Sequence, residues 1–127
     1  MAIEQTSPEA AHLEKIFDAL SRRKYDLSCE ATVQRQIEEA LFAGGVSHKR
    51  ERWLSDRDRV DFLCEGGIAL EVKLRPRQAR EIHRQLLRYC QDDAVRTVVL
   101  VTARTIGLPH ELNGRPCVVF ALGRCLL

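Results

Sequence analysis

Two acids and a lysine stand among apolar residues in the stretch RVDFLCEGGIALEVKL, which runs from Arg59 to Leu74. The apolar residues alternate on both sides of a Glu-Gly-Gly triplet, and this pattern predicts two strands joined by a turn. Successive side chains of a strand point to opposite faces of the sheet. We expect the core-facing set to be Val60, Phe62, Cys64, Ile68, Leu70, Val72 and Leu74. Asp61, Glu71 and Lys73 should then share the other face.

The length of the turn decides which residues of the two strands face each other. A three-residue loop of Glu65, Gly66 and Gly67 pairs Cys64 with Ile68, Phe62 with Leu70 and Val60 with Val72. The same register places Asp61 directly across from Glu71. A two-residue loop would turn one apolar set away from the core, which burial does not allow. Three-residue hairpin loops with a glycine in the left-handed conformation are common.

Two acids directly across a strand pair need a counter-charge. Paired Cβ atoms lie roughly 4.5–5.5 Å apart, where like charges destabilise the sheet. A divalent cation offsets this repulsion, and carboxylate oxygens suit Mg²⁺ or Mn²⁺. Lys73 follows Glu71 by two residues on the same face, where it can hold a water molecule or a phosphate oxygen beside the ion. The alternative is a solvated, salt-bridged strand face, on which Glu-x-Lys is common.

The elements that position these residues follow from hydrophobic periodicity and capping signals. Ser7 and Pro8 begin one helix, and Ser28 caps a second that ends near Ala43, before two glycines. A third helix runs from Pro76 to about residue 92. Strands are expected at 46–54, 59–65, 68–74, 96–102 and 116–122. Antiparallel strands followed by a helix and a continuously apolar strand predict a single α/β domain, residues 1–127, with a mixed central sheet.

The composition fits an intracellular protein with one hydrophobic core. The 127 residues are 45% hydrophobic and 30% charged, and no apolar run is long enough to cross a membrane. The N-terminal residues do not resemble a secretion signal, so we expect a cytoplasmic location. The five cysteines include no Cys-x-x-Cys pair, which argues against zinc and for reduced, mostly buried thiols. The net charge is only +2, but basic residues cluster at 22–24, 49–52 and 75–88, which predicts a polyanionic partner.

An acid on one strand and Glu-x-Lys on the next resemble the PD-(D/E)XK nuclease superfamily. Asp61 and the triplet EVK, Glu71 to Lys73, carry the resemblance, and Val60 stands where the superfamily often has proline. The likeness covers residues 28 to about 102. It implies a restriction-endonuclease-like αβββαβ core with an extra N-terminal helix, and Mg²⁺- or Mn²⁺-dependent hydrolysis of DNA. Asp61, Glu71 and the carbonyl of Val72 would hold one or two ions, and Lys73 would orient the attacking water.

Two further features belong to this resemblance. The helix after the lysine strand carries QLLRY, in which Gln85 and Tyr89 are one turn apart, as in lambda-exonuclease-like and RecB-like members. Gln85 is expected to reach the bound water or a phosphate, braced by Tyr89. Members of the superfamily also use an acid from the preceding helix. The candidates on that helix are Glu30, which is favoured, Glu38 as the runner-up, and Glu39, and a solvated helix face is the alternative for each. Glu51 is a separate candidate, which can point into the site from the first strand.

A stripe of arginines on the same helix suits the phosphates of a DNA backbone. The stripe comprises Arg77, Arg80, Arg84 and Arg88. No aromatic cluster suggests base stacking, so we expect little sequence reading. A homodimer would give DNA a longer groove. The alternative function is a nucleic-acid-binding or assembly module that keeps the fold without turnover. Exonuclease or endonuclease action, DNA or RNA, linear or branched substrates, and a setting in repair, recombination, defence or a phage all stay open.

Overall fold

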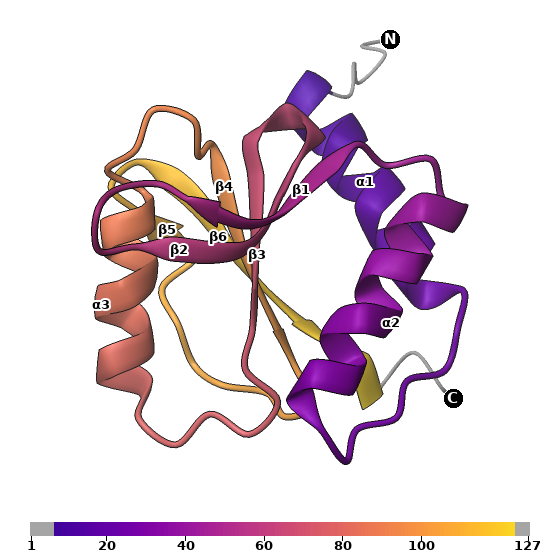
Figure 1. Ribbon diagram of the computed structural model, residues 1–127. Coiled ribbons are helices and arrows are strands. Elements are labelled where there is room, and N and C mark those ends of the chain that lie inside the picture. Colours follow the sequence, from indigo (N-terminus) through magenta and orange to yellow (C-terminus); the bar gives the residue numbers. More distant parts are fainter. Residues whose placement is uncertain (1–6, 124–127) are drawn as a thin grey trace, which may run out of the picture.

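Three helices and a six-stranded sheet make up residues 7–123, the part of the chain described by the computed structural model (Figure 1). The helices are α1 (Pro8–Ser21), α2 (Glu30–Ala43) and α3 (Ala79–Tyr89). The strands are β1 (His48–Trp53), β2 (Arg59–Cys64), β3 (Ile68–Val72), β4 (Thr97–Thr102), β5 (Glu111–Leu112) and β6 (Arg115–Ala121). A 3₁₀ turn, Glu65–Gly67, joins β2 to β3. The predicted order of elements is confirmed, with β5 as an unpredicted addition.

The sheet is mixed, and different helices cover its two faces. The strand order is β1-β2-β3-β4-β6-β5, with antiparallel pairing among β1, β2 and β3 and parallel pairing among β3, β4 and β6. α1 and α2 pack on one face and α3 on the other (Figure 1). β4 is buried along its whole length, as its continuous apolar run predicted. The α/β class and the mixed central sheet are therefore confirmed. Within residues 7–123, no helix combines the length and the apolar character that a bilayer span requires.

The β2–β3 hairpin has the predicted register near its turn and loses it near the acids. Cys64 pairs with Ile68 and Phe62 with Leu70, and Gly66 takes the left-handed conformation, with φ of 76°. The backbone pairing of β2 with β3 ends at Phe62. Beyond it, the Asp61 amide donates to Glu71 Oε1 at 3.3 Å, and the Val72 amide donates to Asp61 Oδ2 at 2.7 Å. The two carboxylates thus replace backbone carbonyls as acceptors where the strands part.

The alternation of side chains along β2 is also interrupted at Asp61. Phe62 belongs to the core under α1 and α2, whereas Val60 belongs to the core under α3. The prediction that Val60 shares a face with Phe62 is therefore wrong. On the neighbouring strand, Glu51 has φ of 52°, while Arg50 and Arg52 on either side of it pair with Phe62 and Val60. Both strands depart from regular geometry beside Asp61, and this rotates the chain between Phe62 and Val60.

Two predicted helix starts are wrong by one residue and by three. The N-cap of α2 is Cys29, because the Ser28 hydroxyl instead donates to Asp26 Oδ1 at 2.6 Å. α3 begins at Ala79 and not at Pro76. The chain remains bound to β4 after β3 ends, since the Ala103 amide donates to the Leu74 carbonyl at 3.0 Å. The residues from 75 to 78 are needed to cross from the sheet to the helix.

The cysteines of the described residues are free thiols. Cys64, Cys90 and Cys117 are buried, as predicted, whereas Cys29 is exposed; Cys125 lies outside the described residues. Burial raises the pKa of Cys64 to about 12 and that of Cys117 to about 11. These two side chains therefore stay protonated near neutral pH and act as core residues.

Candidate active site

Asp61, Glu71 and Lys73 come together where β2 and β3 part. Glu71 is 4% exposed, and its Oε2 lies 3.5 Å from Lys73 Nζ, which is partly exposed. The opposite oxygen, Oε1, accepts the Asp61 amide at 3.3 Å and the Tyr89 hydroxyl at 3.1 Å. Asp61 is held through Oδ2 by the Val72 amide. Each carboxylate is thus fixed through one oxygen, which leaves Asp61 Oδ1 and Glu71 Oε2 as the candidates for binding a ligand.

The electrostatics of this pair favour a cation. Burial raises the pKa of Glu71 to about 7, and the charge of Asp61 adds to this effect, against the opposing effect of Lys73. Burial is also the main cause that raises the pKa of Asp61, and the nearby charge of Glu51 contributes in the same direction. Ionising both acids is therefore costly in this site. A bound cation would lower that cost.

We expect this cost to appear as a pH dependence of stability. The pKa of Glu71 rises on folding from about 4.5 to about 7, so folding favours its protonated form. The resulting stabilisation is complete below pH 4.5 and is lost as the pH rises through 7. In EDTA, Glu71→Gln should therefore gain stability relative to the wild type between those pH values, by about 3 kcal/mol. Urea denaturation of both proteins across this range measures the difference. If the stability of the two proteins changes with pH in parallel, the raised pKa of Glu71 in the folded protein is contradicted.

Tyr89 and Gln85 extend the site onto α3. The Tyr89 hydroxyl lies 3.1 Å from Glu71 Oε1 and 3.0 Å from the Arg59 carbonyl, and it accepts a hydrogen bond from Gln85 Nε2 at 2.9 Å. Burial raises the pKa of Tyr89 further above its ordinary value, and the Glu71 charge acts in the same direction. The hydroxyl therefore remains a hydrogen-bond donor. Gln85 and Tyr89 are brought to the acids as a connected pair, with Tyr89 in direct contact with Glu71.

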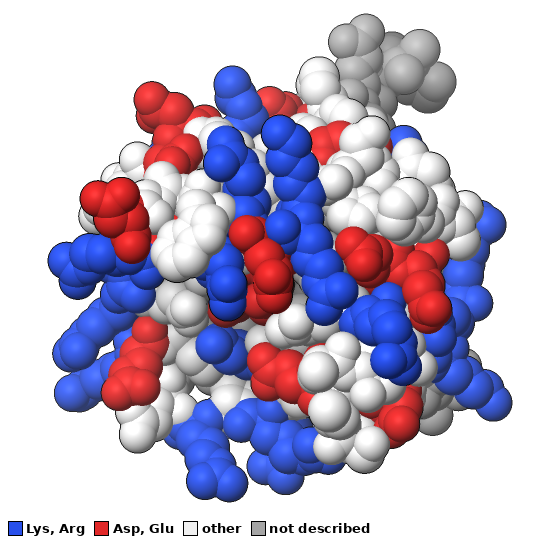
Figure 2. Space-filling model, viewed as in Figure 1, with Lys and Arg blue, Asp and Glu red and all other residues white. Residues whose placement is uncertain are grey.

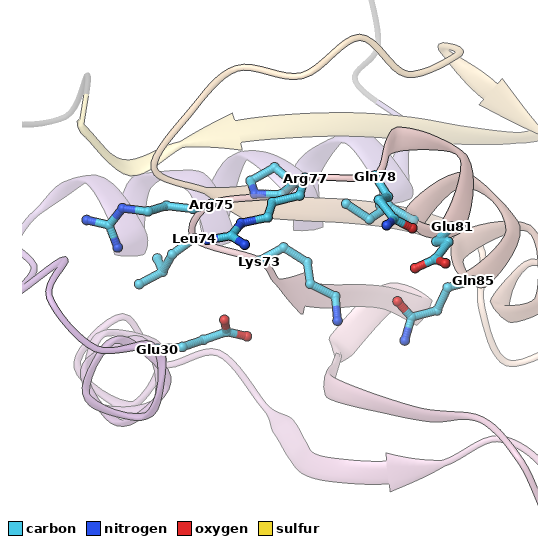
Figure 3. A pocket seen from close by; sticks show the side chains of 10 residues that line it. Glu30, Lys73, Leu74, Arg75, Arg77, Gln78, Glu81 and Gln85 are labelled. Carbon is cyan, nitrogen blue, oxygen red and sulfur yellow. The ribbon is translucent and has the colours of Figure 1, made fainter.

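An open pocket of about 350 Å³ lies beside these residues. Glu30 from α2, Lys73 after β3 and Gln85 from α3 extend toward a common space within it (Figure 3). The remaining lining residues are Leu74, Arg75, Pro76, Arg77, Gln78, Glu81 and Ile82. Glu81 was not predicted as a site residue, although its position one turn before Gln85 on α3 was a usable signal.

Of the candidate acids of α2, one lies in the pocket and two form ion pairs with arginines. Glu30 lies in the pocket, and burial raises its pKa, opposed by the charge of Lys73 and reinforced by that of Asp61. Glu38 instead lies 3.4 Å from Arg50 Nη1, and Glu39 lies 2.9 Å from Arg23 Nη1. Of the three, Glu30 is the one that the fold brings to the acids. Glu51 is exposed on β1, close enough for its charge to act on Asp61.

The predicted arginine stripe is only partly continuous. Arg80, Arg84 and Arg88 are exposed on α3, whereas Arg77 precedes the helix and lines the pocket. Arg88 Nε is engaged by Asp58 Oδ1 at 2.9 Å, from the loop after β1. Figure 2 shows basic side chains over α3 and along the lower edge of this face, with acidic side chains nearer its centre. Basic and acidic side chains thus lie side by side on this face.

The donor atoms fit a hard divalent cation that keeps part of its water shell. No group of three or more His, Cys, Asp or Glu side chains within residues 7–123 is arranged to hold a metal ion. Asp61 and Glu71 act on each other's charge and each keeps one oxygen without a backbone partner, which suits Mg²⁺, an ion that binds through one or two carboxylates and several waters. The structure is therefore compatible with Mg²⁺ or Mn²⁺ at Asp61 and Glu71.

Comparisons of the chain with protein families, with curated protein sequences and with solved structures gave no match. The function therefore has to be inferred from the residues of the site and their geometry.

Proposed function

We propose that the protein is a metal-dependent deoxyribonuclease of the PD-(D/E)XK type. The observation that carries this proposal is the convergence of Asp61, Glu71 and Lys73 where β2 and β3 part. The hydrogen bond of Tyr89 to Glu71 supports it, because the QLLRY motif is thereby connected to the acids. The order from α2 through β4 is also compatible with the αβββαβ core of restriction-endonuclease-like proteins.

The residues of the site have distinct roles in the proposed reaction. Asp61 and Glu71 hold the cation, which supplies a Lewis acid and lowers the pKa of bound water when present. Lys73 reaches into the pocket, where its ammonium can donate to the attacking water and to a phosphate oxygen as negative charge develops. Tyr89 fixes the Glu71 carboxylate, and Gln85 in turn orients the Tyr89 hydroxyl. Arg77 in the pocket and Arg84 on α3 bind flanking phosphates in this proposal.

Cleavage assays with plasmid, linear and branched DNA test this proposal. We expect cleavage with Mg²⁺ or Mn²⁺ and none in EDTA, because water activation and charge neutralisation both require the cation. Glu71→Gln, purified in parallel, is the control for contaminating nucleases, since it retains the shape of the side chain. If the wild type cuts no DNA with either ion, a binding or assembly module of the same fold replaces the enzyme as the proposed function.

Arg84, one of the exposed arginines of α3, should contribute to DNA binding without sequence preference. Arg84→Ala should weaken binding to unrelated DNA sequences by the same factor, because phosphate contacts do not depend on the bases. It should also reduce the slope of log K against log salt by about one unit. Fluorescence anisotropy in EDTA at several salt concentrations measures both effects. Arg22→Ala is the matched control, because Arg22 is an exposed arginine at the C-cap of α1 and lies 2.7 Å from Asp18. An unchanged slope for Arg84→Ala would show that DNA follows another path.

A further inference from the structure

Trp53, at the end of β1, has a side chain that is largely exposed and that packs into neither hydrophobic core of residues 7–123. It is 53% exposed, and with Phe42 it is one of the two exposed large apolar side chains of residues 7–123. Trp53 belongs to neither hydrophobic core, although the next residue, Leu54, packs against the core under α3. A tryptophan that served the fold would bury most of its large apolar surface. This one keeps about half of its surface available for a ligand.

Arg59 covers one side of the Trp53 ring. Its guanidinium carbon lies 5.4 Å from the ring centroid, and the two residues are paired across β1 and β2. An arginine stacked on an aromatic ring keeps its positive charge and most of its donors free. The pair therefore offers an aromatic surface and a phosphate-binding charge at one point. The two residues are six positions apart in sequence, and the pairing of β1 with β2 brings them together.

The loop that connects Trp53 to Arg59 is held in a defined conformation. The Leu54 amide donates to the Asp58 carbonyl at 2.8 Å, and Ser55 Oγ accepts the amides of Arg57 and Asp58 at 3.2 and 3.1 Å. Arg88 of α3 lies 2.9 Å from the Asp58 carboxylate. An ordered loop positions the aromatic ring in advance, and binding then loses less conformational entropy.

The same pair lies next to the candidate active site. The Tyr89 hydroxyl that contacts Glu71 Oε1 at 3.1 Å also lies 3.0 Å from the Arg59 carbonyl. Arg59 precedes Asp61 by two residues on β2. A nucleotide that stacks on Trp53 would therefore lie along the same pair of strands, β1 and β2, that carries Asp61.

We propose that Trp53, supported by Arg59, stacks on an unpaired DNA base beside the phosphate to be cleaved, so that the preferred substrate carries unpaired nucleotides, as in a single-stranded end or flap. This inference rests on the proposed nuclease function and specifies its substrate class. Bases inside a duplex have both faces covered by their neighbours, whereas an unpaired base offers a face to an aromatic side chain. Stacking of this kind tolerates any base, which agrees with a site that does not read sequence.

The chain contains one tryptophan, so fluorescence excited at a wavelength that its two tyrosines do not absorb reports on Trp53 alone. In EDTA and low salt, we expect oligothymidylate and the single-stranded arm of a flapped duplex to quench this fluorescence, and a blunt duplex to leave it unchanged. Trp53→Ala should weaken binding of labelled oligothymidylate about 5- to 100-fold and spare binding of the blunt duplex. Trp53→Phe should have an intermediate effect, because it keeps a smaller ring.

Phe42→Ala is the matched control, because Phe42 is 73% exposed and packs against His48 at the other end of β1. It should leave both affinities unchanged. Equal quenching by blunt duplex, wild-type affinity of Trp53→Ala for oligothymidylate, or no DNA binding by the wild type would each overturn the inference. These readouts need no cleavage. Trp53-dependent binding without cleavage in Mn²⁺ would contradict the nuclease proposal alone, whereas cleavage with a substrate preference unchanged in Trp53→Ala would contradict the stacking alone.

Discussion

Lys73→Ala should lower the rate of DNA cleavage by roughly 10²- to 10³-fold or more, the effect of removing one well-placed donor from a reacting oxyanion. The ammonium lies 3.5 Å from Glu71 Oε2 and reaches into the pocket, where it is partly exposed. It can therefore act on a water or a phosphate without itself holding the cation. Single-turnover cleavage with saturating Mn²⁺ measures the loss and separates chemistry from product release.

Cation binding should survive the same substitution. Lys73 opposes the rise in the pKa of Glu71 that burial causes, and its removal takes one positive charge away from the acids. Calorimetric titration with Mn²⁺ above pH 8 should therefore give an affinity equal to or higher than that of the wild type. Arg75→Ala, at an exposed neighbour that lines the same pocket, controls for a general loss of positive charge. A lower Mn²⁺ affinity in Lys73→Ala would contradict the role assigned to the lysine.

The second large effect is expected at Asp61, where a single substitution should abolish cation binding without lowering the stability of the cation-free protein. Asp61→Asn removes a charge that raises the pKa of Glu71, in addition to the larger effect of burial. In the wild type, the Val72 amide donates to Asp61 Oδ2 at 2.7 Å. The side-chain oxygen of the asparagine can accept the same hydrogen bond. In EDTA the variant should be as stable as the wild type or more stable by roughly 0.2–1 kcal/mol, the usual cost of like charges that lie close together on neighbouring strands.

Mn²⁺, in contrast, should stabilise the wild type more than Asp61→Asn. Saturating Mn²⁺ should raise the Tm of the wild type by several degrees, since a ligand at about 100 times its Kd stabilises by roughly 3 kcal/mol. Asp61→Asn should show little increase, because it has lost one of two carboxylate ligands, and its cleavage should disappear. Thermal melts of both proteins with EDTA and with Mn²⁺ provide the comparison. A clear loss of stability in EDTA together with a wild-type response to Mn²⁺ would remove Asp61 from the site.

The register of the hairpin was predictable because burial and the turn act together. Only a three-residue loop places both apolar sets toward the interior, and the structure has Phe62 opposite Leu70 as that argument requires. The same reasoning failed at Val60, since it assumed that strand pairing continues without interruption. Carboxylates that accept backbone amides are not visible in an alternating pattern. The rotation of the chain at Asp61 was therefore beyond what periodicity predicts.

Long-range contacts explain the other differences between the expected and the observed elements. Pro76 looked like the first residue of a helix, but the Leu74 carbonyl is bound to the Ala103 amide of a segment 29 positions later. β5 has two residues, which is too short for a hydrophobic period. The choice among Glu30, Glu38 and Glu39 likewise depended on partners from other elements. The bond of Tyr89 to Glu71 joins residues 18 positions apart, and only the resemblance in the QLLRY motif indicated that Tyr89 belongs near the acids.

Where the pairing of β2 and β3 is interrupted, two backbone amides can report on cation binding. The amide protons of Asp61 and Val72 are donated to carboxylates that are themselves the expected cation ligands. Any ion that draws electron density from those oxygens changes the shielding of both protons, so no reporter group has to be attached to the protein. In a ¹⁵N-resolved NMR spectrum, these two resonances should report occupancy of the site directly, even in a variant that has lost all turnover.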